Sequence, residues 1–335
     1  MTKTKTAEHP LSSAILGVGR AVPDRVMTNH DLEKIVDTTD RWIVERTGIK
    51  ERRISEPGAV TSEFCERAAR VALERAGLGP EDIDLIIVGT ATPDFPFPST
   101  ASILQERLGT RGQMAFDVTA ACSGFLYGLI IADQFVKSGW ARNALVIGAE
   151  LLSKILNWQD RSTCVLFGDG AGAVVLGRAT DGRGIIATSA NADGSTWPIL
   201  HMPGGGMRNL PSRDTVDKNL HTISMEGNEV FRVAVRSLLE TARDVLKKAG
   251  VEHTDVDLFI PHQANMRIID AVGKRIGIDE SRVFKNLERY GNTSAASIPI
   301  ALSEAFETGR IKSGDLVLLD AFGAGATTAA VLLRW

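Results

Sequence analysis

Two segments of the chain follow the same order of residue types. Residues 68–88 read AARVALERAGLGPEDIDLIIV and residues 241–261 read TARDVLKKAGVEHTDVDLFIP, so that Gly77 corresponds to Gly250. Each copy predicts an amphipathic helix that ends at a C-cap glycine, then a short polar turn and an apolar strand. The copies are separated by about half the chain length, which indicates two similar halves packed together, because solenoid proteins repeat at much shorter intervals.

The repeat continues more weakly outside this pair. Residues 144–149 (ALVIGA) resemble residues 315–321 (DLVLLDA), and each half ends in a glycine-rich segment that leads into an apolar strand. Strands and helices alternate in both halves, which predicts an α/β architecture with sheets covered by helices. We therefore expect an N-terminal half at residues 1–180 and a C-terminal half at residues 181–335.

One segment, residues 196–220, breaks the alternating pattern. Its prolines and consecutive glycines predict an exposed insertion, more typical of a surface or interface loop than of a catalytic one.

The composition excludes several functional classes. The 335 residues are 44% hydrophobic with a net charge of −3, so the chain can bury a large core and has no charge bias toward nucleic acid or membranes. Its first ten residues lack the apolar region of a signal peptide, and no apolar run approaches the roughly 20 residues that span a bilayer. These features predict a soluble, cytoplasmic protein without nucleic-acid or membrane partners.

The three cysteines, Cys65, Cys122 and Cys164, lie far apart in the sequence. An odd number without C-x-x-C spacing argues against a disulfide framework and against a zinc site. The six histidines are scattered and no H-E-x-x-H motif occurs, so we expect no metal. We interpret Cys65 as a helical residue near the surface, and Cys164 as a packing residue before a strand at residues 165–167.

Cys122 lies in the segment DVTAACSGF (residues 117–125), where an apolar strand ends in small residues. The spacing of Phe125, Leu129, Ala132 and Val136 then marks one face of a helix. Cys122 is thus placed at a helix N-terminus, where free N–H groups and the helix dipole stabilise a thiolate. The alternative from position alone is a small buried apolar residue.

Two further segments place polar residues beside predicted strands or helices. His262, in PHQANMR (residues 261–267), follows an apolar strand and precedes a helix, and Asn292, in GNTSAASIP (residues 291–299), lies in a turn before another helix. Taken alone, His262 fits a structural or a catalytic histidine equally, and Asn292 fits a helix cap.

The order Cys, His, Asn within two duplicated halves resembles the thiolase superfamily of condensing enzymes, and within it the β-ketoacyl-acyl carrier protein synthase III family. The resemblance covers nearly the whole chain and rests on six segments. They are GVGRAVP (17–23), DTTDRWIVERTGIKERR (37–53), DVTAACSGF (117–125), DRSTCVLFGDGAG (160–172), PHQANMR (261–267) and YGNTSAAS (290–297). The resemblance implies the duplicated, five-layered αβαβα thiolase fold and a homodimer.

The resemblance also implies the chemistry. Cys122 would take an acyl group from acyl-CoA, and malonyl-acyl carrier protein would lose carbon dioxide and attack the thioester, with His262 and Asn292 stabilising the enolate. The backbone N–H groups of Cys122 and Ala324 would bind the thioester oxygen. Acyl-CoA is then a substrate, and no resident cofactor is expected.

Further site residues follow from the same resemblance. The CoA entrance would be formed by Thr38, Trp42, Arg46 and Arg161, with Asn265 near the pantetheine channel. Phe97 would line the acyl pocket of the neighbouring subunit. The surface that docks the carrier protein would be Gln263, Ala264, Asn265, Met266, Arg267 and Lys274.

The chain departs from the family pattern at two places. Ala324 interrupts the usual triple glycine, and residues 326–329 (ATTA) replace the usual Thr-Trp-Gly, which leaves the size of the primer open.

The segment GDGAG (168–172) does not fit a phosphate-binding motif and predicts a turn between strands. The alternatives are a starter-unit or acyl-transfer enzyme of secondary metabolism, and a nonenzymatic acyl-CoA sensor, which would have lost a catalytic residue.

Overall fold

The computed structural model describes residues 12–179 and 181–335 and contains two large sheets. The first has the order β1–β7–β6–β4–β5, from strands Ser12–Ala21, Asp169–Ala179, Asn143–Leu151, Leu85–Gly89 and Met114–Val118. The second has the order β8–β13–β12–β11, from strands Gly184–Ala192, Thr327–Arg334, Leu316–Gly323 and Leu258–Pro261. The expectation about a leader in the first ten residues lies outside the described residues.

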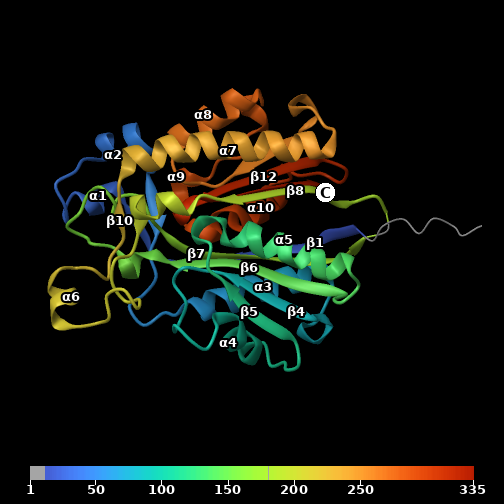
Figure 1. The fold of residues 1–335 in the computed structure, drawn as a ribbon, viewed down its shortest axis with the longest axis horizontal. Helices are drawn as coiled ribbons and strands as arrows, with labels where there is room; N and C mark the ends of the chain where they lie inside the picture. Colours follow the sequence, from blue (N-terminus) through green and yellow to red (C-terminus); the bar gives the residue numbers. More distant parts are fainter. Residues whose placement is uncertain (1–11, 180) are drawn as a thin grey trace, which may run out of the picture.

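Helices form three layers around these sheets (Figure 1). Helices α3 (Thr61–Ala76) and α4 (Thr100–Arg107) cover the outer face of the first sheet. Helices α5 (Gly124–Lys137) and α10 (Ser297–Glu307) lie between the two sheets, and α7 (Gly227–Ala249), with α8 (Met266–Ile276) beside it, covers the outer face of the second. The five-layered αβαβα arrangement predicted from the resemblance is confirmed.

The repeated sequence pattern corresponds to repeated backbone geometry. Helix α3 ends at Gly77, with a φ of 67°, and α7 ends at Gly250, with a φ of 65°. Asp84 and Asp257 then make the same bond, because each carboxylate accepts a backbone N–H where the neighbouring strand begins, from Asn143 at 3.3 Å and from Leu316 at 2.8 Å. Asn143 and Leu316 are separated by the same number of residues as Gly77 and Gly250.

The duplication includes the turns that precede the two central helices. The 3₁₀ turn η2 (Ala121–Ser123) leads into α5, and the 3₁₀ turn η7 (Ser294–Ala296) leads into α10. Ala121 and Ser294 occupy the left-handed region with φ of 46° and 48°, which is uncommon for residues other than glycine. Their separation along the chain again equals that of the two C-cap glycines, so each half opens its central helix with the same turn.

Three expectations about local structure are corrected. Cys65 lies in α3 as predicted but is fully buried, not near the surface. Residues 165 and 166 lie in a turn rather than a strand, and Phe167 forms only an isolated bridge to Asn292, although Cys164 is buried as predicted. The GDGAG segment is no turn, because β7 begins at Asp169 and the following small residues pair with β1 and β6.

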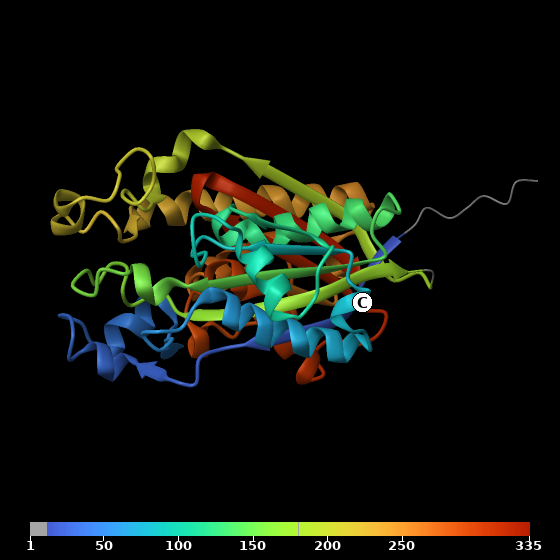
Figure 2. The ribbon, with the colours of Figure 1, turned by 90° about the horizontal axis from the view of Figure 1, so that it is seen from below.

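The shorter elements gather mostly at one end of the molecule. They comprise the hairpin of β2 (Val26–Thr28) and β3 (Glu51–Arg53), the helices α1 (Asn29–Leu32), α2 (Asp40–Thr47), α6 (Arg213–Asp217) and α9 (Leu287–Tyr290), and the strands β9 (Leu200–His201) and β10 (Ser224–Met225). Figures 1 and 2 show that α1, α2 and α6 lie at the same end. In the segment at residues 196–220, Met207 and Leu210 are exposed, as an insertion predicts. No helix within residues 12–179 and 181–335 is long and apolar enough to cross a membrane.

Candidate active site

The three residues predicted to act on the substrate meet in one pocket. Cys122 lies in η2 just before α5, His262 directly follows β11, and Asn292 lies between α9 and η7. All three line a cavity of about 400 Å³. The duplicated halves therefore bring the ends of distant segments together at one point, as the resemblance predicts.

The glycine-rich loop packs directly against Cys122. A Cβ atom at Gly323 would lie 2.9 Å from the Cys122 nitrogen and 2.7 Å from the Ala120 oxygen, so no larger residue fits. Two side-chain hydrogen bonds fix the position of the loop. The Thr327 hydroxyl donates to the Ala120 oxygen at 3.0 Å, and the Ser123 hydroxyl donates to the Thr327 oxygen at 2.9 Å. This packing places the backbone of Ala324, the predicted second oxyanion donor, in the loop beside Cys122.

His262 is held in one neutral form. Its Nδ1 lies 2.6 Å from the hydroxyl of Ser297, and that hydroxyl oxygen accepts the backbone N–H of Gln263 at 3.3 Å. The Ser297 proton is therefore free to be donated to Nδ1, which leaves the ring proton on Nε2. Burial lowers the pKa of His262 to about 3, so the imidazole stays uncharged at neutral pH and presents an N–H donor.

Asn292 is oriented in a comparable way. Its Oδ1 accepts the backbone N–H of Ser294 at 2.8 Å, which is a turn bond two residues along the chain and not a helix cap, since the N-cap position is Thr293. With its oxygen occupied, Asn292 has the Nδ2 amide left to donate. The pocket thus contains two uncharged donors, on His262 and Asn292, and a bound oxygen atom that gains negative charge would accept from both.

The predicted thiolate at Cys122 is corrected. Burial raises the pKa of the Cys122 thiol to about 12, the bond to Ser294 lowers it, and the carboxylate of Glu150 raises it. Desolvation therefore outweighs the favourable position at the start of α5. Cys122 rests as a protonated thiol and must lose its proton as it attacks.

Trp42 lines the pocket, and two guanidinium groups lie against its ring. The Arg46 carbon Cζ is 5.0 Å from the centre of the Trp42 ring and that of Arg161 is 5.2 Å away. Asn265 donates to the backbone oxygen of Arg46 at 3.1 Å and also lines the pocket. Thr38 is not among the described residues that line it, so four of the five residues predicted for the CoA entrance are brought together.

Comparisons with known proteins identify the family. Residues 116–194 match the family model described as 3-oxoacyl-[acyl-carrier-protein] synthase III, and residues 246–335 match the model of its C-terminal part. The β-ketoacyl-[acyl-carrier-protein] synthase III of Caldanaerobacter subterraneus is 54% identical over 97% of this chain and 98% of its own length. The chain belongs to the synthase III family.

Solved structures agree with this assignment. The crystal structure of the synthase III from Aquifex aeolicus superimposes with a TM-score of 0.90 at 53% identity, and covers 96% of this chain and 100% of that one. The priming β-ketosynthase of the R1128 polyketide pathway superimposes with a TM-score of 0.89 at 36% identity, over 99% of both chains.

The carrier-docking surface predicted from the synthase III family needs one correction. Gln263 is buried, and its side chain donates to the oxygens of Pro261 and Phe284 and accepts the N–H of Asn286. Its amide is therefore fully used inside the protein and cannot contact a carrier protein.

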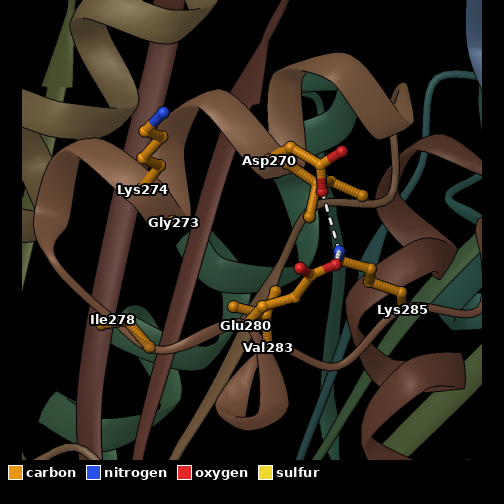
Figure 3. Close-up of a pocket in the computed structure, with 8 residues that line it drawn as sticks. Asp270, Gly273, Lys274, Ile278, Glu280, Val283 and Lys285 are labelled. Atoms are coloured by element: carbon orange, nitrogen blue, oxygen red, sulfur yellow. Dashed lines mark hydrogen bonds and ion pairs between the residues drawn. The ribbon is translucent and has the colours of Figure 1, made fainter.

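The remaining residues predicted for docking divide into two groups. Ala264, Asn265 and Met266 are half-buried, whereas Arg267 and Lys274 are exposed. Figure 3 shows Lys274 on α8 beside a second hollow of about 340 Å³, where Lys285 bridges Asp270 at 2.8 Å. The exposed basic residues of α8 are thus Arg267 and Lys274, which were predicted, together with Arg275.

Phe97 does not line the pocket of its own chain, and its side chain is 85% exposed. The family resemblance assigns it to the neighbouring subunit, and this exposed position is compatible with that prediction.

Sequence reasoning missed three polar residues that contact the predicted site: Ser297 beside His262, Ser294 beside Cys122, and Glu150 beside Ser294. Both serines belong to the quoted YGNTSAAS segment, which was the available signal. Glu150 gave no such signal, because it is a single charged residue within an otherwise apolar stretch and belongs to none of the quoted segments.

Replacing Trp42 with alanine should raise the KM for acyl-CoA about tenfold with little change in kcat, because stacking of a base on an aromatic ring contributes about 1–3 kcal/mol. The matched control is Trp140→Ala, since Trp140 is also partly exposed but packs on Phe135, away from this pocket. Steady-state kinetics with varied acyl-CoA would measure both. An unchanged KM in Trp42→Ala would contradict the assignment of this entrance to CoA.

Proposed function

We propose that the protein condenses an acyl-CoA primer with malonyl-acyl carrier protein, releasing carbon dioxide, and so starts bacterial fatty acid synthesis. The supporting observation is that one pocket of a synthase III family member holds Cys122 together with two uncharged donors, on His262 and Asn292. A nonenzymatic acyl-CoA sensor would not need all three residues.

In the first half-reaction, the Cys122 sulfur attacks the thioester carbon of acyl-CoA and CoA leaves as a thiol. A thiol suits this transfer because it is both a good nucleophile and a good leaving group, so exchange between two sulfurs is nearly balanced in energy. The backbone N–H groups of Cys122 and Ala324 stabilise the oxygen that gains negative charge.

In the second half-reaction, malonyl-carrier protein loses carbon dioxide, and the resulting enolate attacks the acyl-Cys122 thioester. Negative charge then develops on the malonyl thioester oxygen, where Nε2–H of His262 and Nδ2–H of Asn292 donate to it. Because the pKa of His262 is about 3, the imidazole contributes as a neutral donor rather than as a base.

The proposal extends to the other partners. Arg267 and Lys274 supply positive charge for docking an acidic carrier protein.

Strand β5 lies at an edge of the first sheet, and with the exposed Phe97 it supports a homodimer. We place the reaction in the cytoplasm, where CoA thioesters occur, with no metal or resident cofactor. Light scattering that returned the mass of one chain, 36.0 kDa, would contradict the dimer.

The deciding experiment supplies the purified enzyme with acetyl-CoA and malonyl-carrier protein. We expect carbon dioxide release and a ketoacyl product in equal amounts.

The similarity to a priming β-ketosynthase of a polyketide pathway supports a starter-unit enzyme of secondary metabolism as the second candidate. A panel of straight, branched and longer acyl-CoA primers against one acceptor separates the two, and absence of product with every primer would refute the condensation.

A further inference from the structure

Glu150 is a buried carboxylic acid that the proposed reaction leaves without a role. It lies near the end of β6 with no exposed surface. Its carboxylate accepts the backbone N–H of Ala91 at 3.1 Å, the hydroxyl of Thr92 at 2.6 Å and the hydroxyl of Ser294 at 3.1 Å. These partners are all neutral, whereas the buried Asp133 is paired with Lys137 at 2.9 Å. Asp169 is also buried and accepts only neutral donors, from Ser55 and Ser153, so the lack of a cation alone does not distinguish Glu150. What distinguishes Glu150 is its contact with Ser294 beside the reacting cysteine.

Ser294 connects this acid to the reacting sulfur. Its side chain lies within reach of the Cys122 sulfur and lowers the pKa of that thiol, and its hydroxyl donates to Glu150 at 3.1 Å. A hydroxyl has one proton to donate and can accept from another donor. While Glu150 is ionised, Ser294 donates to the carboxylate and its oxygen is free to accept the proton of Cys122. Once Glu150 is protonated, Ser294 can donate to the Cys122 sulfur instead, and this is the direction that lowers the pKa of the thiol.

We propose that Ser294 and Glu150 form a proton relay that deprotonates Cys122 during acyl transfer. As the sulfur attacks the thioester, the S–H bond breaks and the proton passes to the Ser294 oxygen, while the Ser294 proton passes to Glu150. When the bond between carbon and the CoA sulfur breaks, Glu150 returns a proton through Ser294 to that sulfur. Free CoA thiol leaves, and both relay residues recover their starting states.

The properties of the neighbouring groups favour Glu150 over His262 as the acceptor. Burial raises the pKa of Glu150 to about 7, and its hydrogen bonds to Thr92, Ala91, Ser294 and Ala295 only partly offset this. This value lies far closer to the pKa of Cys122, about 12, than that of His262, about 3. The two half-reactions therefore use different residues. Glu150 acts through Ser294 in the acylation of Cys122, and His262 acts with Asn292 in the condensation.

The test rests on the proposed function and separates its two half-reactions. Glu150→Gln keeps the side-chain shape but cannot take a proton, and Ser294→Ala fits the backbone because Ala121 adopts the same conformation in the other half. We expect each variant to slow Cys122 acylation by acetyl-CoA about 100-fold, measured by intact mass spectrometry over time. The double variant should be no slower than the slower single variant, because both changes interrupt one relay.

Enzyme that has been fully acylated by long incubation and freed of CoA then receives malonyl-carrier protein. Both variants should release carbon dioxide at close to the wild-type rate, which a general loss of structure would not allow. Asp133→Asn is the matched control, since Asp133 is also buried and accepts a serine hydroxyl, that of Ser13, but lies outside the pocket. Wild-type acylation in Glu150→Gln, equal losses in both half-reactions, or losses that multiply in the double variant would each overturn the relay. A wild type that takes up no acyl group would instead refute the proposed function.

Discussion

Replacing Cys122 with alanine will leave a folded protein that accepts no acyl group. We expect the acyl adduct, which intact mass spectrometry detects on the wild type after treatment with acyl-CoA, to disappear. Product formation should fall by at least about 10³-fold, since no neighbouring group can replace the nucleophile. The loss of one sulfur atom from a side chain that lines the pocket should change the stability little.

The matched control for this experiment is Cys164→Ala. Cys164 is a buried thiol without contact to the described pocket, and burial raises its pKa to about 11. This variant should acquire the adduct as the wild type does. An adduct that persists in Cys122→Ala, or that is lost from Cys164→Ala with the fold intact, would show that the acyl group is carried elsewhere.

The fold could be predicted because the duplication is present in the local sequence. Gly77 and Gly250 end equivalent helices in the left-handed conformation, which favours glycine, and aspartates at equal spacing tie equivalent strands together. The local sequence pattern did not predict correctly where the strand within residues 165–172 begins. Apolar residues suggested a strand before the glycines, whereas the strand begins at Asp169, within the glycine-rich stretch.

The site could be predicted in its members but not in its protonation states. Cys122, His262 and Asn292 lie at positions that the repeat and the resemblance mark. The state of each group depends on burial, which distant segments create: Cys122 is protonated in spite of its position at a helix start, and His262 is neutral. The same limit explains Gln263, whose amide is occupied by the segment around Phe284 and Asn286.

The second large effect is expected for Asn292→Asp, which separates orientation from hydrogen-bond donation. Aspartate has nearly the same shape and can still accept the backbone N–H of Ser294, but it presents a carboxylate oxygen where Asn292 presents an amide donor. Loss of one donor to a developing oxyanion lowers the rate about 10²–10³-fold, and the added negative charge opposes the enolate further.

Asn292→Asp should therefore still form acyl-Cys122, while carbon dioxide release from malonyl-carrier protein falls by at least about 10²-fold. Asn191→Asp, an exposed position outside the pocket, makes the same chemical change and should leave both steps intact. The acylation step serves as the internal test of folding. If Asn292→Asp condensed at the wild-type rate, the enolate would have to be stabilised without this amide, and the division of labour between Cys122 and the two donors would be wrong.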